Sequence, residues 1–150
     1  RFNDTEPTTS VFTVGDADAV NKSSETYIAY LFSEKQGFSK FGSYTGNGDA
    51  DGGFIYLGFR PAWFMCKNYQ DAGDNWIVHD NKRDTFNVTD NGLAPNSAEA
   101  EFTDVDMDFL SNGVKMRNNT GRANSAKTFI YMAFAESPFV NSNGVPNNAR

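Results

Sequence analysis

The loop from Asn47 to Gly52 reads Asn-Gly-Asp-Ala-Asp-Gly, and its residue types and spacing come closest to a recognisable chemistry. Side-chain oxygens at alternate positions, with a glycine at a sharp turn, are typical of the first half of a calcium-binding loop. An EF-hand would need a bidentate glutamate at position 58, where this chain has Gly58, and no helical pattern flanks the loop. We therefore exclude an EF-hand and keep two interpretations. The pattern favours an ordinary acidic hairpin loop, and the alternative is a looser calcium site at Asn47, Asp49 and Asp51. No other cofactor is expected.

A second acidic pattern lies at Asp104, Asp106 and Asp108, which alternate with apolar residues. On a strand, these three carboxylates would share one face. Because like charges repel, that face must be solvated or must bind a cation. The pattern favours a solvated edge strand, since charged edge strands prevent aggregation.

Candidates for catalysis are few. The single histidine, His79, would have to serve as the base of a catalytic triad, but the chain has no Gly-x-Ser-x-Gly elbow. The single cysteine, Cys66, lies in an apolar run, which predicts a buried, inert thiol. Glu34 and Glu136 follow two similar apolar segments and are expected to be solvated strand-end residues. A pair of glycosidase carboxylates stays open in any chain with 19 acidic residues. We assign no catalytic residue and expect no enzyme.

Aromatic side chains could provide stacking surfaces for sugars. Trp63 and Trp76 lie inside apolar segments and are expected in the core. Tyr44 and Tyr69 lie among polar residues and are the better candidates for exposure. The candidate ligand-binding residues are therefore Tyr44, Asn47, Asp49, Asp51 and Tyr69.

The composition limits the classes of partner. The chain has 150 residues, about one domain, with 13 Lys and Arg against 19 Asp and Glu, and its net charge is −6. This charge argues against nucleic-acid binding, which needs clustered positive charge, and against docking on an anionic membrane. No apolar run approaches the roughly 20 residues that span a bilayer, so no membrane insertion is expected. One cysteine excludes an internal disulfide.

The elements that must position these residues read as β-strands. Aromatic residues make up 15% of the chain and alternate with Asn- and Gly-rich turns, a composition typical of β proteins. No long window has a helical apolar period, and the best helical candidate is a weak turn at Ser97–Glu101. The fold class predicted is an all-β antiparallel sandwich, of the jelly-roll or concanavalin type. The expected strands are Thr26–Phe32, Phe54–Phe59, Trp63–Lys67, Trp76–His79, Met107–Leu110, Val114–Arg117 and Phe129–Phe134.

Turn signals support these strands. Arg60-Pro61 should break the strand ladder or mark a bulge before Trp63. Asn112-Gly113 lies between two apolar runs and predicts a hairpin with a type I′ turn, because both residues tolerate a positive φ. The pairs at Asn47, Asn91 and Asn143, each followed by glycine, are also interpreted as tight turns.

Two segments of the chain match each other. Thr26–Glu34 reads TYIAYLFSE and Thr128–Glu136 reads TFIYMAFAE. Alternation would place Ile28, Tyr30 and Phe32 on one face, and Ile130, Met132 and Phe134 on the equivalent face. We interpret the two segments as central core strands that are neighbours or pseudo-equivalent.

The expected organisation has three parts. Residues 1–25 form an N-terminal arm or linker, with a possible edge strand at Phe12 and Val14. Residues 26–140 form the sandwich, with exposed loops at 68–75 and 80–106. Residues 141–150 form a polar C-terminal tail.

Several motifs together resemble a known family. They are residues 37–48 (GFSKFGSYTGNG), 58–62 (GFRPA), 108–113 (DFLSNG) and 131–139 (YMAFAESPF). They are similar to a bacteriophage virion structural domain, found at the C-terminal ends of tail-fibre-like proteins and common in marine phages. The resemblance covers almost the whole chain and rests on structural motifs, so it supplies no ligand residues.

The resemblance implies a β-rich module on the virion surface, at a tail fibre or another appendage, with host attachment as its role. We therefore expect a non-catalytic receptor-binding module that recognises a host-surface glycan or protein and contacts other virion proteins. By analogy with fibre tips, a homo-oligomer is expected, with a trimer favoured. The alternative is a purely structural virion module for capsid decoration or fibre assembly.

Overall fold

The computed structural model describes residues 4–140. It divides into two compact units, Arg1–Phe32 and Ser33–Arg150, which are described separately below. The tail predicted at 141–150, including the Asn143-Gly144 pair, lies outside the described residues.

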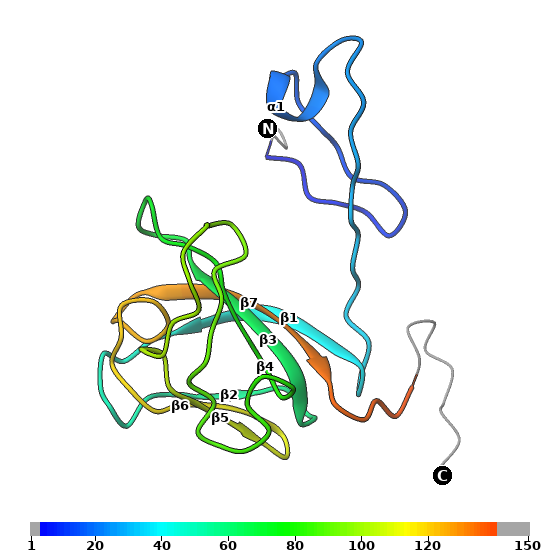
Figure 1. Ribbon diagram of the computed structural model, residues 1–150. Helices are drawn as coiled ribbons and strands as arrows, with labels where there is room; N and C mark the ends of the chain where they lie inside the picture. The colour runs from blue at the N-terminus through cyan, green and yellow to red at the C-terminus, as the bar shows by residue number, and fades with distance from the viewer. Residues whose placement is uncertain (1–3, 141–150) are drawn as a thin grey trace. The chain divides into compact units, whose positions relative to one another are not determined.

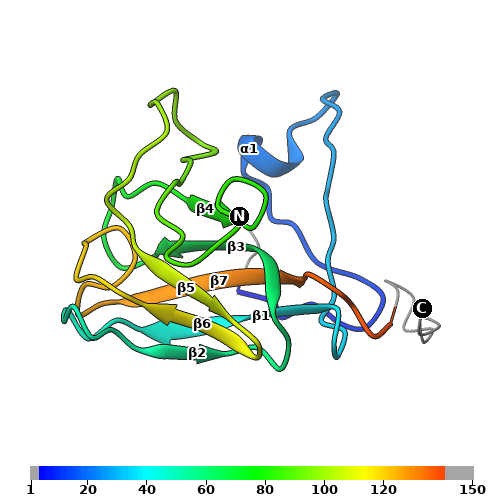
Figure 2. The same cartoon turned by 60° about the horizontal axis from the view of Figure 1, so that its bottom comes forward.

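The second unit contains two antiparallel sheets, so the predicted all-β, sandwich-like fold is confirmed (Figures 1 and 2). One sheet has the strand order β1-β7-β3-β4, formed by Ser39–Thr45, Thr128–Ala135, Pro61–Asn68 and Ile77–Asp80. The other has the order β2-β6-β5, formed by Phe54–Tyr56, Gly113–Met116 and Met107–Leu110. Strand β1 was not predicted, and β2 ends three residues earlier than expected.

The core lies between the two sheets and is filled by alternate residues of their strands, as the two-residue period of a strand requires. Large side chains with almost no exposure come from both sheets: Phe64, Ile77, Met107, Phe109, Val114, Met116 and Phe129. Burying so many large apolar side chains is the main favourable contribution to folding.

Strand β7 is central because β1 and β3 pair with it on either side. The register of β3 against β7 shifts between Pro61 and Trp63, which confirms the irregularity predicted at this proline. As the alternation predicts, Ile130, Met132 and Phe134 share one face of β7. The buried face is the opposite one, which carries Phe129, Tyr131 and Ala133.

The predicted hairpin between β5 and β6 is present, but its turn differs from expectation. Leu110 pairs with Gly113, so the two turn residues are Ser111 and Asn112. Gly113 does not have a positive φ. A Cβ atom there would lie 2.1 Å from the carbonyl oxygen of Ile55 on β2. The glycine therefore permits the close approach of β2 and β6, not a type I′ turn.

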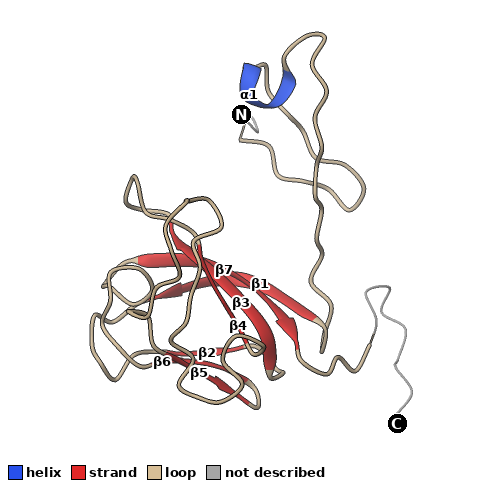
Figure 3. Ribbon diagram, viewed as in Figure 1, coloured by secondary structure: helices blue, strands red, loops and turns tan. Residues whose placement is uncertain are grey.

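The first unit contradicts the strand predicted at Thr26–Phe32. This segment is extended but belongs to no sheet (Figure 3), and its side chains are exposed. Phe12 and Val14 do not form the possible edge strand either. The regular element of this unit is a one-turn helix, α1, at Asp18–Asn21.

Two expectations for the loops also change. Ser97–Glu101 contains no helical turn. The connection 80–106 is not simply exposed, because Thr89 pairs with Met107 and Gly92 pairs with Phe102, and Thr89 and Val105 are buried. No helix among the described residues has the length and apolar character that a membrane crossing requires.

Candidate functional site

Four loops of the second unit meet at one end of the sandwich, which we call the polar loop end. Thr45 pairs with Thr128 and Asn68 pairs with Phe129, so the chain segments beyond these residues emerge on the same side. The polar loop end comprises residues 46–52, 69–75, 96–99 and 118–127. Hydrogen bonds and ion pairs join each loop to another, which makes this end a connected polar surface.

The predicted calcium loop, 47–52, is held by its own side chains. Asn47 Oδ1 accepts the Asp49 N–H at 3.0 Å, and Asp49 Oδ1 accepts the Asp51 N–H at 2.9 Å. The Lys115 ammonium lies 2.6 Å from Asp51 Oδ1 and, by its hydrogen bond and charge, lowers the pKa of that carboxyl. These oxygens therefore already have partners. Across the part of the chain that the structure describes, no cluster of three His, Cys, Asp or Glu residues could hold a metal.

Asn124 anchors this loop from the segment before β7. Its side chain is buried, and its Nδ2 donates to Asn47 Oδ1 at 3.0 Å and to the Asp49 carbonyl at 2.8 Å. Its Oδ1 accepts the Asn47 N–H at 3.2 Å. The residue was missed because it is 77 positions from Asn47 and is one of many asparagines.

The two candidate tyrosines differ. Tyr44 lies on β1 and not in a polar loop, and its ring stacks on Phe129 with centroids 5.1 Å apart. Its hydroxyl donates to the Ala123 carbonyl at 2.7 Å, and burial raises its pKa well above the usual value. Tyr69, in contrast, is 57% exposed at the polar loop end. Of these two tyrosines, only Tyr69 is exposed to a ligand.

A buried amide supports the loop that carries Tyr69. Asn68 donates from Nδ2 to Asp71 Oδ2 at 2.8 Å and to Asp74 Oδ2 at 2.7 Å. The hydrogen bond from Asn68 and the ammonium of Lys127, 3.3 Å away, lower the pKa of Asp71. The loop is thus fixed by charge-assisted bonds, which are stronger than neutral ones.

Arg122 joins two further loops of this end. Its guanidinium bonds to Glu99 Oε1 at 2.9 Å and lies 3.3 Å from Asp104 Oδ2, with the Phe102 ring beneath it at 4.5 Å. It also lines a hollow of about 180 Å³ with Gly73, Asp74, Asn75 and Ile77. This volume is below the range of about 300–1,000 Å³ typical of small-molecule pockets.

The aspartates at 104, 106 and 108 do not form the solvated strand face that their spacing predicts. Asp108 lies on β5, is 9% exposed and pairs with Arg117 at 2.9 Å. Asp104 lies outside the strand and pairs with Arg122. Arginines therefore balance the charge of two of the three carboxylates, so the spacing does not require a bound cation.

His79 and Cys66 face the interior. His79 is fully buried, neither ring nitrogen has a hydrogen-bond partner among the described residues, and Phe102 contacts its ring edge-on. Desolvation lowers its pKa to about 4. Cys66 is buried as predicted, and desolvation raises its pKa to about 12. Both groups are neutral at pH 7, and neither can reach a substrate at the surface.

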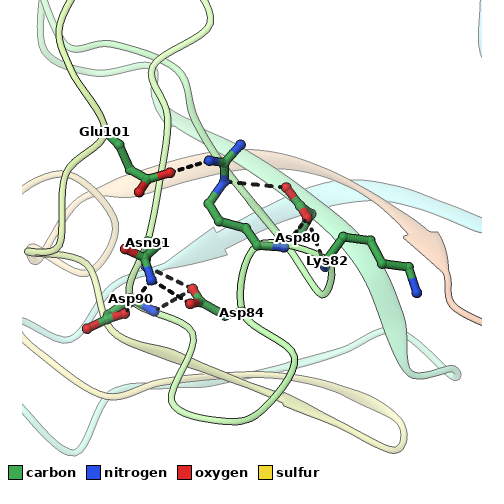
Figure 4. A network of polar contacts seen from close by, with 7 residues as sticks. Asp80, Lys82, Asp84, Asp90, Asn91 and Glu101 are labelled. Carbon is green, nitrogen blue, oxygen red and sulfur yellow. Dashed lines mark hydrogen bonds and ion pairs between the residues drawn. The ribbon is translucent and has the colours of Figure 1, made fainter.

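A second polar network holds the connection 80–106 (Figure 4). Asp80 accepts the N–H groups of Lys82 and Arg83, whose guanidinium bonds to Glu101. Asp84 accepts two more backbone N–H groups, from Asp90 at 3.1 Å and Asn91 at 2.9 Å. The carboxylates serve turns of the chain, so this network is structural.

Comparison with known protein families matches residues 1–138 to one family, described as a domain of unknown function (DUF7483). No curated protein and no solved structure matches the chain.

Proposed function

Because the chain belongs to the DUF7483 family, whose description assigns no activity, we propose a function from the site and from the motifs of the sequence. We propose a non-catalytic module on the surface of a bacteriophage virion, at a tail fibre or another appendage, that recognises a host-surface glycan. The virion assignment rests on the motif resemblance, and the recognition role rests on the polar loop end.

The polar loop end is the observation that carries this proposal. Hydrogen bonds and ion pairs between its loops hold them in place, and the loops expose Asp49 and Tyr69 together with amide groups. Amides and carboxylates can hydrogen-bond sugar hydroxyls, and an exposed tyrosine ring offers an apolar surface for a sugar face. Loops on a rigid scaffold are the usual place for binding residues.

The proposed module has no catalytic role because of where its reactive side chains lie. His79 and Cys66, the residues that a base or a sulfur nucleophile would use, are both buried and neutral at pH 7. Contacts at such a shallow polar surface are individually weak. A homo-oligomer would raise the overall affinity by avidity.

A structural virion module is the second candidate. One observation favours it: the exposed large apolar side chains of the first unit, which are typical of a surface that another protein covers. In this case the polar loop end would be only a solvated surface.

A glycan array tests the proposal. The purified chain is applied with calcium and again with EDTA, beside the variants Tyr69→Ala and Tyr56→Ala. Tyr56 is a matched control because it is 61% exposed but lies on β2, outside the polar loop end. We expect selective binding that only Tyr69→Ala abolishes.

Other results would revise the proposal. Loss of binding in EDTA would make Asn47, Asp49 and Asp51 a metal site. Binding that Tyr69→Ala retains would place recognition elsewhere. No binding in either condition contradicts glycan recognition and favours the structural module.

A further inference from the structure

The first unit has no core of its own. None of residues 4–32 is buried. Exposure is highest at Ile28 (79%), Tyr30 (80%) and Leu31 (74%), and Val11 and Phe12 are exposed as well. A segment of this size cannot bury enough apolar surface to be stable alone, so such exposure is typical of a region covered by a partner.

The exposed side chains surround an apolar hollow of about 940 Å³. Phe12, Val14 and Val20 line it on one part of the chain, and Tyr27, Ile28 and Leu31 line it on another. Tyr27 is tied to α1, because its hydroxyl donates to the Asp18 carbonyl and accepts the Lys22 N–H. The extended apolar segment that carries Tyr27, Ile28 and Leu31 thus lines one side of the hollow.

The residues of this segment are those of a strand. Thr26–Phe32 matches Thr128–Phe134, which forms most of β7 and pairs with strands on both sides. In the first unit both faces of the segment carry large apolar groups. A strand that is apolar on both faces is typical of a position buried on both sides.

We propose that Tyr27–Leu31 of two copies of this chain pair with each other as antiparallel strands centred on Ala29. In this register Tyr27 faces Leu31 of the second copy, and Ile28 faces Tyr30. Aromatic residues opposite aliphatic or β-branched ones are among the stabilising cross-strand pairs. The contact is isologous, as in a two-fold dimer.

The flanking charges disfavour two alternatives to this register. Glu25 would face Ser33 of the second copy, and Glu34 would face Ser24. A shift by one residue towards the C-terminal side would place Glu25 opposite Glu34 twice, and in-register parallel pairing would place each glutamate beside its own equivalent. Like charges directly opposite each other destabilise a sheet, so both alternatives are disfavoured.

A second copy is favoured over the edge of the chain's own sheet. Strand β1 lies at that edge and is preceded by a turn in which Lys35 pairs with Ser39. Beyond this pair, the Ser39 hydroxyl donates to the Ser33 carbonyl and the Glu34 carboxylate accepts the Phe41 N–H. Side chains therefore occupy the positions through which a hairpin with β1 would continue.

The available area is consistent with a dimer. A standard interface takes about 800 Å² from each partner. Buried aromatic residues contribute roughly 150–250 Å² each, and this unit exposes Phe12, Tyr27 and Tyr30 together with aliphatic residues. One face of the paired strands would pack on the apolar hollow.

The first test measures the mass of the full chain by sedimentation velocity from about 1 µM to about 1 mM. We expect a monomer–dimer equilibrium for the wild type. Ile28→Lys and Tyr30→Glu should each raise the dimer dissociation constant by at least about tenfold, because each places a charge opposite an apolar side chain. The double variant I28K/Y30E should recover most of the association, since its opposite charges face each other only in this register, whereas I28K/Y30K should not.

The second test uses the burial of Cys66, which leaves no accessible native thiol among the described residues. Under mild oxidation, Ala29→Cys should give a disulfide-linked dimer, and Asn119→Cys, exposed on the second unit, should not. A monomer throughout the concentration range, a trimer, or cross-linking of the two variants to the same extent would overturn the proposal. None of these readouts depends on a glycan, so they are independent of the proposed recognition function.

Discussion

Thr26–Phe32 and Thr128–Phe134 have nearly the same residue pattern and opposite surroundings. The second segment pairs with β1 on one side and with β3 on the other, and its Phe129 is fully buried. The first belongs to no sheet, and its Ile28 is 79% exposed. The difference shows that a segment with a strand-like sequence joins a sheet only where neighbouring strands pair with it and a core covers its apolar side chains. The residues of the segment itself do not supply these partners.

The largest expected effect is a direct test of this comparison. Phe129→Ala should lower the free energy of unfolding by about 3–5 kcal/mol, because it empties a buried site and removes the stacking on Tyr44. Tyr27→Ala, at the matching position of the first segment, should change it by less than about 0.5 kcal/mol. Urea denaturation at low protein concentration measures both values. Equal losses would mean that the first segment belongs to the folding core.

The sequence was sufficient to predict β3, β5, β6 and β7, because their apolar alternation matches what a sandwich core requires. It was insufficient for β1, since Gly42 and Ser43 have low strand propensity. A Cβ at position 42 would lie 3.0 Å from the Tyr131 hydroxyl, so that glycine admits a core ring. Such long-range contacts are invisible in a local pattern.

The buried side chain of His79 affects stability through its protonation, whereas that of Phe129 does so through its volume. The pKa of His79 in the folded protein is about 4 because of desolvation, against an ordinary value of about 6.5. The unfolded chain therefore takes up the proton first. Neutral, buried His79 makes its full contribution to the free energy of unfolding above pH 6.5. As the pH falls towards 4, this free energy decreases by about 3 kcal/mol. Denaturation curves between pH 7 and pH 4.5 measure this loss.

A His79→Phe variant controls for the carboxylates. Asp51, Asp71 and Glu99 have lowered pKa values and are present in both proteins, so any pH-dependent loss from them is common to the variant and the wild type. The variant should therefore show a much flatter dependence on pH. An equal dependence in the variant and the wild type would assign the effect to other groups.

A glycine packed between strands and a glycine in an exposed turn should also respond differently to substitution by alanine. Gly113→Ala should destabilise the protein by about 1–3 kcal/mol, because its Cβ would overlap the Ile55 carbonyl oxygen at 2.1 Å. Gly121→Ala, in an exposed turn with no atom within 4 Å of the added Cβ, should be close to neutral. Thermal unfolding of the two variants compares them. A neutral Gly113→Ala would show that β2 can move away from β6.

The candidate site was predictable only in part, because some of its contacts join residues that are far apart in the sequence. Tyr69 follows a strand and is exposed as expected, whereas Tyr44 has similar polar neighbours in sequence but points into the core. The support from Asn124 depends on a contact across 77 residues, for which no local signal exists. Local polarity predicts exposure only where the fold leaves the side chain uncovered.

The smallest expected effect separates these two tyrosines. Tyr44→Phe removes the donor to the Ala123 carbonyl and should cost about 1 kcal/mol, since a buried acceptor loses its partner. Tyr69→Phe keeps the exposed ring and should change stability by less than a few tenths of a kcal/mol. Paired urea curves measure the difference. If Tyr69→Phe were the more costly variant, the ring at the polar loop end would be a structural support, and its assignment to ligand binding would have to be withdrawn.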